Sequence, residues 1–515
     1  MKIAYLTGGM LLLSSGIIAQ EPADALRYSW LTQGGTARNY AIGGTMVSLG
    51  GDLSATYINP AGLAFYKTNE FVLTPGFSFI NNKSTYLGET EKGKKSNFNY
   101  GASGLVFATP TRQGSNWRNY SFGLAVNRAA NFNSKIFYKG LNNQTSYSEK
   151  YLEELINNNV TDPNAAAQNF PYGASLAFNT YLIDTISGTG GSVAGYRSLS
   201  TPLTGVNQQQ EIETKGGITD FSFGASANLL DKLYLGGSIG INILDFERTS
   251  TFREEDATTT INNFKYFTAA ETLKTSGMGI NAKLGIIYRP VEYFRVGFAF
   301  HTPTFYNMKD EYTAAVTTDL EGYGGSPAVK TQNSKDFNSG EPGEFNYNLV
   351  SPLRLMLGAS YVFREENDVK RQRAFLSADV EYVDYKASSF KTADQTTGGS
   401  NGSDYFEQLN TAIDNQFKST INARIGGELK FHTFMVRAGF AYYGNPYQDD
   451  NIKGRRMNIS GGLGYRDKGV FVDLTYVHQL AKDGFYPYRL DQGFFAPATV
   501  KGGNGNLLLT FGFKF

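Results

Sequence analysis

The fold class that the sequence predicts is all-β: a 14-stranded antiparallel transmembrane β-barrel with an N-terminal hatch, or plug, in its lumen and long extracellular loops containing short helices. Three observations predict it: an apolar leader, segments that alternate between apolar and polar residues, and a composition rich in glycine and aromatic residues. The 515 residues include 58 Gly, 38 Phe and 33 Tyr. Such a composition suits a barrel whose outer face contacts lipid while its lumen is polar.

The leader comprises residues 1–19. Lys2 precedes an apolar run from Ile3 to Ile18, and Ala19 is a plausible cleavage residue; this is the pattern of a secretory signal peptide. The alternative, a transmembrane anchor, would need a longer apolar run. We therefore expect export and cleavage. The chain has no Cys, which excludes disulfides and lipid attachment through cysteine, and its formal net charge of +1 gives no reason to expect a nucleic-acid partner.

Residues 20–67 are expected to form the hatch. Glycines 43, 44, 50 and 51 permit tight turns, and Asn59, Pro60, Ala61 and Gly62 follow one another at its end. Asn-Pro followed by Ala-Gly is typical of turns rather than strands. The sequence therefore predicts a compact, glycine-rich plug that precedes the first strand.

Residues 68–515 are expected to form the barrel. In Ile421–Phe431, Ile421, Ala423, Ile425, Leu429 and Phe431 share one face, which would suit lipid, and polar residues share the other. Fourteen segments are predicted as strands, an even number as in single-chain bacterial barrels: 69–80, 97–108, 118–130, 218–229, 233–246, 278–289, 293–304, 351–363, 373–386, 419–431, 434–444, 457–466, 469–480 and 505–515.

The connections between these segments alternate between mostly tight and long. The tight ones include Leu230-Asp231-Lys232 and His432-Thr433. Because short turns belong on the periplasmic side of such barrels, both ends of the barrel sheet should be periplasmic. A soluble β-sandwich or propeller would also alternate, but it would not explain apolar outer faces, this loop asymmetry and a terminal Phe515.

The residues of the hatch and one later strand resemble the FadL-like outer-membrane transport proteins, which import long-chain fatty acids and other hydrophobic compounds. The match rests on Gly35-Thr36-Ala37-Arg38, on Asn59-Pro60-Ala61-Gly62-Leu63-Ala64, and on Ser351-Pro352-Leu353-Arg354 leading into Leu357–Tyr361. It covers the whole mature chain. The resemblance implies passive transport in the outer membrane of a Gram-negative bacterium.

The resemblance also implies a route. Extracellular loops capture the ligand, a pocket near the hatch holds it, and it leaves sideways through an opening in the barrel wall. Asn59, Pro60 and Ala61 match the family's hatch motif, so together with Gly62 they are expected to gate the pore; the alternative is that they only end the plug. The expected partners are outer-membrane lipids, the hydrophobic ligand and, because of the terminal aromatic residue, the barrel assembly machinery, with other outer-membrane proteins possible.

The loop predicted at residues 131–217 is much the longest. Ser148-Glu149 and Asp162-Pro163 can each start a helix within it, and a third helix is expected after Ser403. The aromatic and aliphatic residues of this loop are candidates for an external hydrophobic capture site: Phe170, Phe178, Tyr181 and Leu182. The alternative is that they pack on one another to cap the barrel.

Basic residues that face the lumen by strand phase could bind a ligand carboxylate. The candidates are Lys283, Arg295 and Arg354. Asp379 and Glu381 also face inward, so mutual ion pairs are the alternative use of these cations.

The third strand carries a charge on its apolar face. Continuing the phase of Phe122 and Leu124 places Arg128 toward lipid, where a charge is costly, so we expect a bulge nearby. The family's lateral opening is associated with a kinked wall strand. Asn127 and Arg128 are therefore candidates for the opening.

No enzyme activity is expected. His301, His432 and His478 are isolated, no motif pairs a nucleophile with a base, and no metal or cofactor site is evident. Two alternatives to transport are a receptor for haem or another lipophile, and a non-transporting partner barrel in an outer-membrane secretion or assembly complex.

Overall fold

The computed structural model describes residues 20–515 apart from 33, 113, 201, 326–328, 364–372, 394–399, 451, 453 and 492–495. The predicted signal peptide, residues 1–19, lies outside the described residues. No helix in the described part of the chain is long and apolar enough to cross a membrane.

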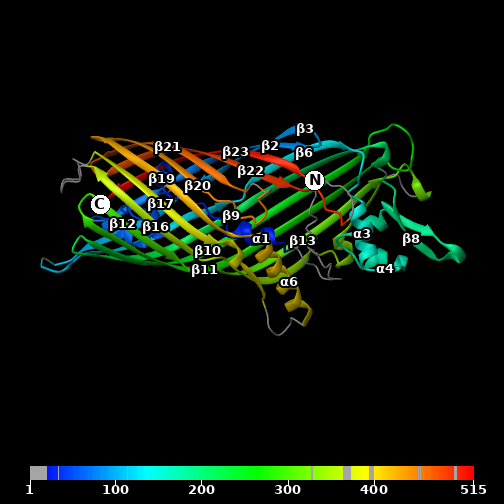
Figure 1. Cartoon of the computed structure of the whole chain (residues 1–515), viewed down its shortest axis with the longest axis horizontal. Coiled ribbons are helices and arrows are strands. Elements are labelled where there is room, and N and C mark those ends of the chain that lie inside the picture. The colour runs from blue at the N-terminus through cyan, green and yellow to red at the C-terminus, as the bar shows by residue number, and fades with distance from the viewer. Residues whose placement is uncertain are drawn as a thin grey trace.

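The described residues form a closed antiparallel β-barrel of fourteen strands, as the sequence predicted (Figure 1). The first three barrel strands are interrupted, and their segments are β1 (Glu70–Leu73) with β2 (Pro75–Tyr86), β3 (Glu89–Tyr100) with β4 (Ser103–Pro110), and β5 (Trp117–Asn131) with β6 (Ser134–Asn142). The next three are β9 (Val206–Leu229), β10 (Leu233–Asp256) and β11 (Tyr266–Val291).

The seventh to ninth strands are again interrupted, as β12 (Phe294–His301) with β13 (Phe305–Asp319), β15 (Gly343–Val350) with β16 (Arg354–Phe363), and β17 (Ala374–Asp384) with β18 (Ser389–Thr392). The last five are β19 (Ser419–Phe431), β20 (Phe434–Tyr443), β21 (Arg456–Asp467), β22 (Val470–Phe485) and β23 (Ala498–Lys514). The barrel closes because β23 pairs with β1, Glu70 opposite Lys514, and with β2, Gly76 opposite Leu508.

Many strands run further than the sequence indicated. Residues 134–142 and 206–217, which were expected to lie in the longest loop, are paired strand, so the 131–217 range is too wide. Residues 81–96, expected as a long connection, are the end of a hairpin that turns at Leu87-Gly88. These extensions project beyond the apolar band, and their outward faces are mostly polar, so they lack the apolar outer face that marks the membrane-crossing strands.

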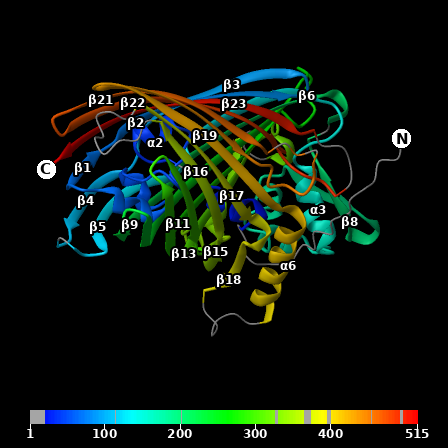
Figure 2. The ribbon, with the colours of Figure 1, turned by 60° about the vertical axis from the view of Figure 1, so that its left-hand side comes forward.

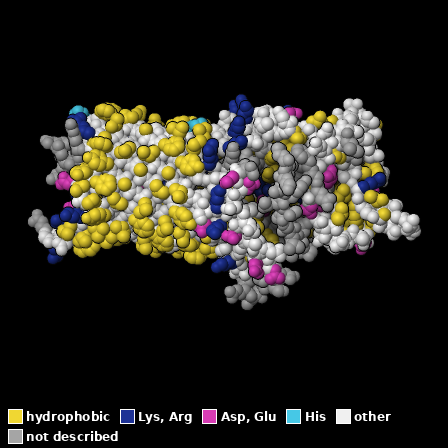
Figure 3. Space-filling view, viewed as in Figure 1, with side chains coloured by type: hydrophobic (Ala, Val, Ile, Leu, Met, Phe, Trp, Pro, Cys, Tyr) yellow, Lys and Arg dark blue, Asp and Glu magenta, His cyan; other side chains and the backbone are white. Residues whose placement is uncertain are grey.

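The outer surface carries a broad apolar band over the half of the barrel that ends in short turns (Figure 3). Its exposed side chains come from every part of the wall and include Phe77, Phe122, Leu284, Leu357 and Leu463. A band of this kind is what a lipid-facing surface requires.

The N-terminal segment lies inside the ring of strands (Figure 2). Its elements are α1 (Pro22–Ser29), α2 (Ala37–Ala41), and the 3₁₀ helices η1 (Leu53–Thr56) and η2 (Pro60–Phe65). Gly50 and Gly51 have φ angles of 71° and 65°, which favour glycine. A β-carbon on Gly50 would meet the Phe65 ring and the Gly62 backbone, so close packing also requires a glycine there.

The long connections hold the other helices. They are α3 (Glu149–Asn157), α4 (Pro163–Gln168), α5 (Ala174–Asn179) and α6 (Ser400–Gln416). In Figure 1, α3 and α4 lie at the right-hand end and α6 projects below the middle of the barrel. Helices therefore begin after Ser148, after Asp162 and before Tyr405, close to the predicted positions. The short strands in these connections are β7 (Ile183–Ser187), β8 (Val193–Ser198) and β14 (Val329–Asn333), and the short 3₁₀ helices are η3 (Thr189–Gly191), η4 (Pro202–Thr204), η5 (Tyr323–Gly325), η6 (Ser334–Phe337) and η8 (Tyr385–Ala387).

Candidate functional site

The hatch motif docks directly onto the barrel wall. Asn59 Oδ1 accepts a hydrogen bond from the Ala61 N–H at 3.2 Å, which starts η2, and its Nδ2 donates to Val47 O at 2.6 Å. The same amide lies 3.3 Å from Phe298 O on β12. Pro60 occupies the first turn of η2, where a missing N–H costs nothing. Asn59 thus joins two parts of the hatch to the wall.

Wall glycines make this docking possible. A β-carbon on Gly236 of β10 would lie 2.4 Å from Ala61 N, and one on Gly285 of β11 would lie 1.8 Å from Asn59 Oδ1. Neither distance is physically accessible, so only glycine fits at these two wall positions. The motif and the glycines opposite it form one packed unit.

A buried ionic network fixes the other side of the hatch. Arg38 Nε lies 3.6 Å from Glu428 Oε2 on β19, and Arg38 Nη1 lies 3.9 Å from Asp52 Oδ2 within the hatch. Arg437 of β20 bridges Glu428 and Asp473 of β22 at 2.6 Å each. Charges buried this deeply are held by paired partners.

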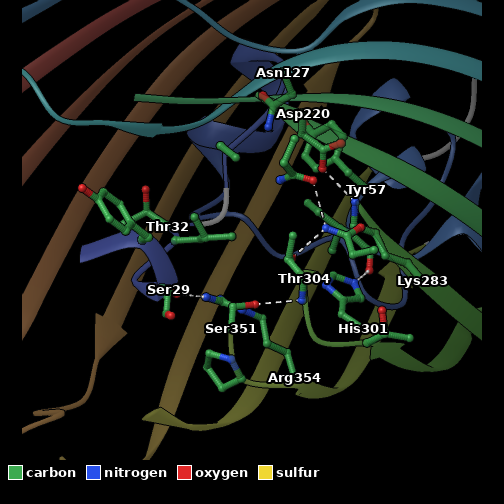
Figure 4. Close-up of a pocket in the computed structure, with 18 of the residues that line it drawn as sticks. Ser29, Thr32, Tyr57, Asn127, Asp220, Lys283, His301, Thr304, Ser351 and Arg354 are labelled. Carbon is green, nitrogen blue, oxygen red and sulfur yellow. Dashed lines mark hydrogen bonds and ion pairs between the residues drawn. The ribbon is translucent and has the colours of Figure 1, made fainter. Parts of the chain in front are cut away.

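A small cavity of about 70 Å³ lies between the hatch and the wall (Figure 4). A cavity of this size holds only a few water molecules. Its hatch side is formed by Tyr28, Ser29, Leu31, Thr32, Gly34, Tyr57 and Ile58, and its wall side includes Asn127, Ala129, Asp220, Asn242, Asn281, Lys283, His301, Thr304, Tyr306, Ser351, Arg354, Met356 and Glu381.

Polar atoms in this cavity are only partly satisfied. His301 Nε2 lies 2.8 Å from Ile58 O in the hatch, and Asn281 Nδ2 donates to Asn242 and Thr304 at 3.0 Å each. The buried Oδ1 atoms of Asn127 and Asn281 have no hydrogen-bond partner among the described residues. Such atoms would readily accept a hydrogen bond from a guest molecule or from water.

Two of the three predicted cations reach this cavity. Lys283 Nζ lies 2.7 Å from Asp220 Oδ2, and Arg354 Nη1 lies 2.9 Å from Glu381 Oε1 while its other nitrogen donates to Ser29 O in α1. Arg295 lies elsewhere, with its guanidinium donating to Leu49 O and stacking over Phe65. Each of the three therefore has a protein partner.

The wall is interrupted beside the cavity, on the third strand. The register of β5 against β9 shifts between Arg128 and Ala130, so the expected bulge is present, with Ala129 as the extra residue. Asn127, which is 3% exposed, points inward and lines the cavity together with Ala129. Arg128 stays on the outer side and donates to Thr219 Oγ1 at 3.2 Å.

The ladder between the second and third strands also stops there. It ends at Ser103 opposite Val126, after which Ala102 donates to Gly35 O in the hatch at 2.9 Å. Further along, β3 and β6, whose residues are all described, have no paired register between them. Instead β6 packs against the β2–β3 hairpin, with the Tyr86 and Tyr138 rings 5.2 Å apart. The wall therefore has a seam that begins at the bulge, where side-chain hydrogen bonds such as Asn82 Nδ2 to Lys135 O at 2.8 Å replace the backbone ladder.

Residues 15–488 match the model of a family described as outer membrane protein transport protein (OMPP1/FadL/TodX). The chain belongs to this family. The predicted membership is thereby confirmed, and FadL/TodX-family barrels are outer-membrane proteins of Gram-negative bacteria.

Two solved structures share the FadL/TodX fold with this chain. The crystal structure of a Pseudomonas aeruginosa FadL homologue has a TM-score of 0.57 and 14% identity, over 95% of this chain and 100% of that one. The P. putida toluene transporter TodX has a TM-score of 0.52 and 15% identity, over 94% and 99%. At such identities the likeness concerns the fold. No curated protein sequence matches the chain.

The N-terminal helix α1 is the part of this FadL/TodX-family site that the sequence analysis missed. Its Leu26 and Tyr28, together with Trp30 directly after the helix, are buried in an apolar cluster with wall residues such as Phe246 and Met308 and with α6. The α6 residues in this cluster are Phe406, Leu409 and Ile413, and Phe417 directly follows the helix. Pro22 at the first helical position, followed by apolar residues at 25, 26 and 28, was the available signal.

The loop residues proposed for capture lie in a different cluster. Leu182 is fully buried, and Phe170 and Phe178 are partly buried against α3, α5 and the ends of the wall strands. Tyr181 is 36% exposed, with Lys330 Nζ 4.4 Å from its ring centroid. Packing of the cap thus accounts for three of the four side chains. Among the described residues no three His, Asp or Glu side chains gather where a metal ion could bind.

Proposed function

We propose that this protein passively transports hydrophobic compounds across the outer membrane, with long-chain fatty acids as one substrate class. The observation that carries the proposal is the juxtaposition of the hatch-side cavity with the seam in the wall. Asn127 belongs to both, since it lines the cavity and precedes the bulge. A lipophile held at the hatch would have a short lateral route into the bilayer.

The entry side of the route ends in apolar surroundings. An open groove beside α6 is lined by polar and charged residues, including Lys391, Glu407 and Asp414, and by Phe390 and Phe406, which belong to the apolar cluster that contains residues of α1. Moving an alkyl chain from water into such surroundings gains about 0.8 kcal/mol per CH₂. Tyr181 remains a candidate for first contact at the cap.

The cavity is too small for a fatty acid in this conformation, so transport requires movement. Helix α1 is the element whose displacement would join the cavity to the apolar cluster, because Tyr28 borders both. Docking of Asn59 on the wall would hold the rest of the hatch while α1 moves. A carboxylate ligand would then exchange with Glu381 at Arg354 or with Asp220 at Lys283, whereas an uncharged ligand would leave these ion pairs intact.

The proposal includes an orientation. The short turns and Phe515 face the periplasm, the helices α3–α6 face the exterior, and the barrel assembly machinery inserts the chain after cleavage of residues 1–19. No enzyme chemistry is part of this proposal.

The test combines binding and uptake. Purified protein in mild detergent should bind a fluorescent fatty acid, and cells that carry it should take up more fatty acid or toluene than cells that lack it. Tyr28→Ala should change binding, and Asn59→Ala should reduce uptake, whereas Gly484→Ala, at an open position, should change neither. A barrel that binds no lipophile and whose deletion leaves uptake unchanged would contradict the proposal, and saturable haem binding in place of fatty-acid binding would favour a haem receptor.

A further inference from the structure

Four lysines form a row across four neighbouring strands. Lys83 of β2 lies directly opposite Lys92 of β3 on one side and Lys501 of β23 on the other. Lys501 in turn lies opposite Lys482 of β22. All four side chains are exposed. Directly opposed residues of antiparallel strands point to the same face, so the four ammonium groups form one continuous positive strip.

The strip lies on the outer face, above the lipid-facing band. Phe77 of β2 is paired with Phe98 and Leu507 in the same registers that pair Lys83 with Lys92 and Lys501. These three apolar side chains are exposed. The lysines therefore continue the same outward face toward the end that carries the long connections. Basic side chains gather along this edge of the apolar band in Figure 3.

The outward rows on either side of the strip hold no carboxylate. The next outward row beyond the lysines is Thr90, Thr85, Thr499 and Gly484, and the row before it contains a fifth lysine, Lys94, with Asn81 and Leu480. Within the described ranges none of these lysines forms an ion pair. Other lysines on the strand extensions do: Lys135 with Glu211 at 2.9 Å and Lys309 with Glu344 at 2.7 Å.

A row of lysines without carboxylates in the neighbouring rows is expected to attract an anion. Like charges directly opposite one another destabilise a sheet, and at interstrand spacings of about 4.8 Å four lysines extend over about 14 Å. A single phosphate would satisfy one or two of them. A headgroup with more than one phosphate, anchored by acyl chains in the adjoining membrane, would satisfy the whole strip.

We propose that this strip binds the phosphorylated headgroup of a glycolipid in the outer leaflet, with its acyl chains lying on Phe77, Phe79, Phe98 and Leu507. The charge complementarity and the unbroken apolar surface on the same strands argue for a membrane lipid rather than free phosphate. The site is separate from the hatch-side cavity, since none of these residues lines it. Lys92 and Phe98 lie on β3, which borders the seam, but the two lysines altered below, Lys83 and Lys501, lie on β2 and β23.

The experiment measures binding of bisphosphorylated lipid A, in mixed micelles, to the full-length protein. Lys83→Gln/Lys501→Gln should weaken binding about 25-fold, since each lysine at an anionic surface contributes about a factor of five. The matched control is Lys135→Gln/Lys309→Gln, which removes the same charge from lysines that have carboxylate partners. It should change affinity by no more than about twofold.

Two further measurements identify the bound group. Dephosphorylated lipid A should bind the unaltered protein weakly, and inorganic phosphate should not displace the bisphosphorylated form. Equal weakening in both double variants, equal affinity for dephosphorylated lipid, or displacement by inorganic phosphate would overturn the proposal. Heat-modifiable gel mobility checks that each variant is folded, and unchanged fatty-acid binding in the variants keeps this result separate from that of the transport test.

Discussion

Asn59 in the hatch occupies the space that a side chain on Gly285 in the wall would need. A β-carbon on Gly285 would lie 1.8 Å from Asn59 Oδ1, while Asn59 is itself held by its bonds to Val47 and Ala61. The two residues therefore depend on each other: the amide can reach across the hatch because the wall leaves room for it.

Gly285→Ala should displace the hatch motif. Overpacking of this kind costs about 1–3 kcal/mol, so we expect a lower unfolding temperature and more leakage of small solutes through the barrel. Asn59→Ala/Gly285→Ala should be less destabilised than the sum of the single changes, because the clash is removed. Thermal unfolding of the purified single and double variants measures these changes in stability. Strict additivity of the changes would contradict the proposed contact. Gly484→Ala is the control.

Arg38→Gln should loosen the opposite side of the hatch. It removes a charged partner of Glu428, which keeps Arg437, so we expect a loss of about 1–3 kcal/mol and faster hydrogen exchange in residues 34–66. Arg118→Gln breaks an exposed pair with Asp231 and should cost less than about 1 kcal/mol. Equal effects of the two changes would show that the hatch is not held by this network.

The cap should lose stability as the pH rises. Burial is the main cause that raises the pKa of Glu154 on α3 above its ordinary 4.5, against the hydrogen bond from Ala174 N–H and the nearby Lys150. A raised pKa in the folded state gives stability that is complete below the unfolded pKa and is lost as the pH rises through the folded pKa.

Glu154→Gln keeps an acceptor for Ala174 N–H without the charge, so it should remove the part of this dependence that Glu154 supplies. Burial also raises the pKa of Glu149 on the same helix, which would supply a remainder of the same sign. Hydrogen exchange of residues 149–179, corrected for the intrinsic exchange rate, measures the stability of the cap at pH values below and above the folded-state pKa of Glu154. Glu153→Gln on the same helix should behave like the unaltered protein. A cap whose protection does not fall with pH in the unaltered protein would refute the expectation.

The barrel was predictable because its membrane-crossing strands alternate strictly, as in Ile421–Phe431, and because an outer apolar face leaves few other folds. The bulge at Ala129 was predictable for the same reason, since Arg128 breaks that alternation. The β2–β3 hairpin and the ends of β9–β11 were not, because the outward face of a strand beyond the lipid is mostly polar and the apolar outer face is missing there. The role of α1 was also hidden: its eight residues reveal an amphipathic helix but not that a barrel surrounds it.

Only some of the residues that line the cavity were predictable from the sequence. Strand phase placed Lys283 and Arg354 in the lumen, where the structure has them. It could not separate Arg295 from them, because strand phase indicates which face of the wall a residue is on but not its position along the barrel axis. Pairing with Asp220 and Glu381 likewise depends on neighbours that are distant in sequence, and these are set by the closed register of the whole barrel.

Deletion of Ala129 tests whether the seam is the exit. Arg128 lies opposite Thr219 and Ala130 opposite Ile218, so removing the extra residue would let β5 pair continuously with β9 while every other partner keeps its register. We expect fatty-acid uptake to fall by about tenfold or more, since a regular strand would close the start of the seam, while the purified protein still binds the ligand.

The same strand supplies the matched control. Its second irregularity lies at Arg118, between Trp117 opposite Leu229 and Asn119 opposite Asn228, at the short-turn end. Deleting Arg118 removes a bulge of the same kind far from the cavity, so uptake should be retained. If both deletions reduce uptake equally, the loss results from general damage to the strand and not from closure of the seam. If neither deletion reduces uptake, the ligand leaves by another path. If deletion of Ala129 abolishes uptake but deletion of Arg118 does not, and ligand binding is preserved, the exit lies beside Asn127.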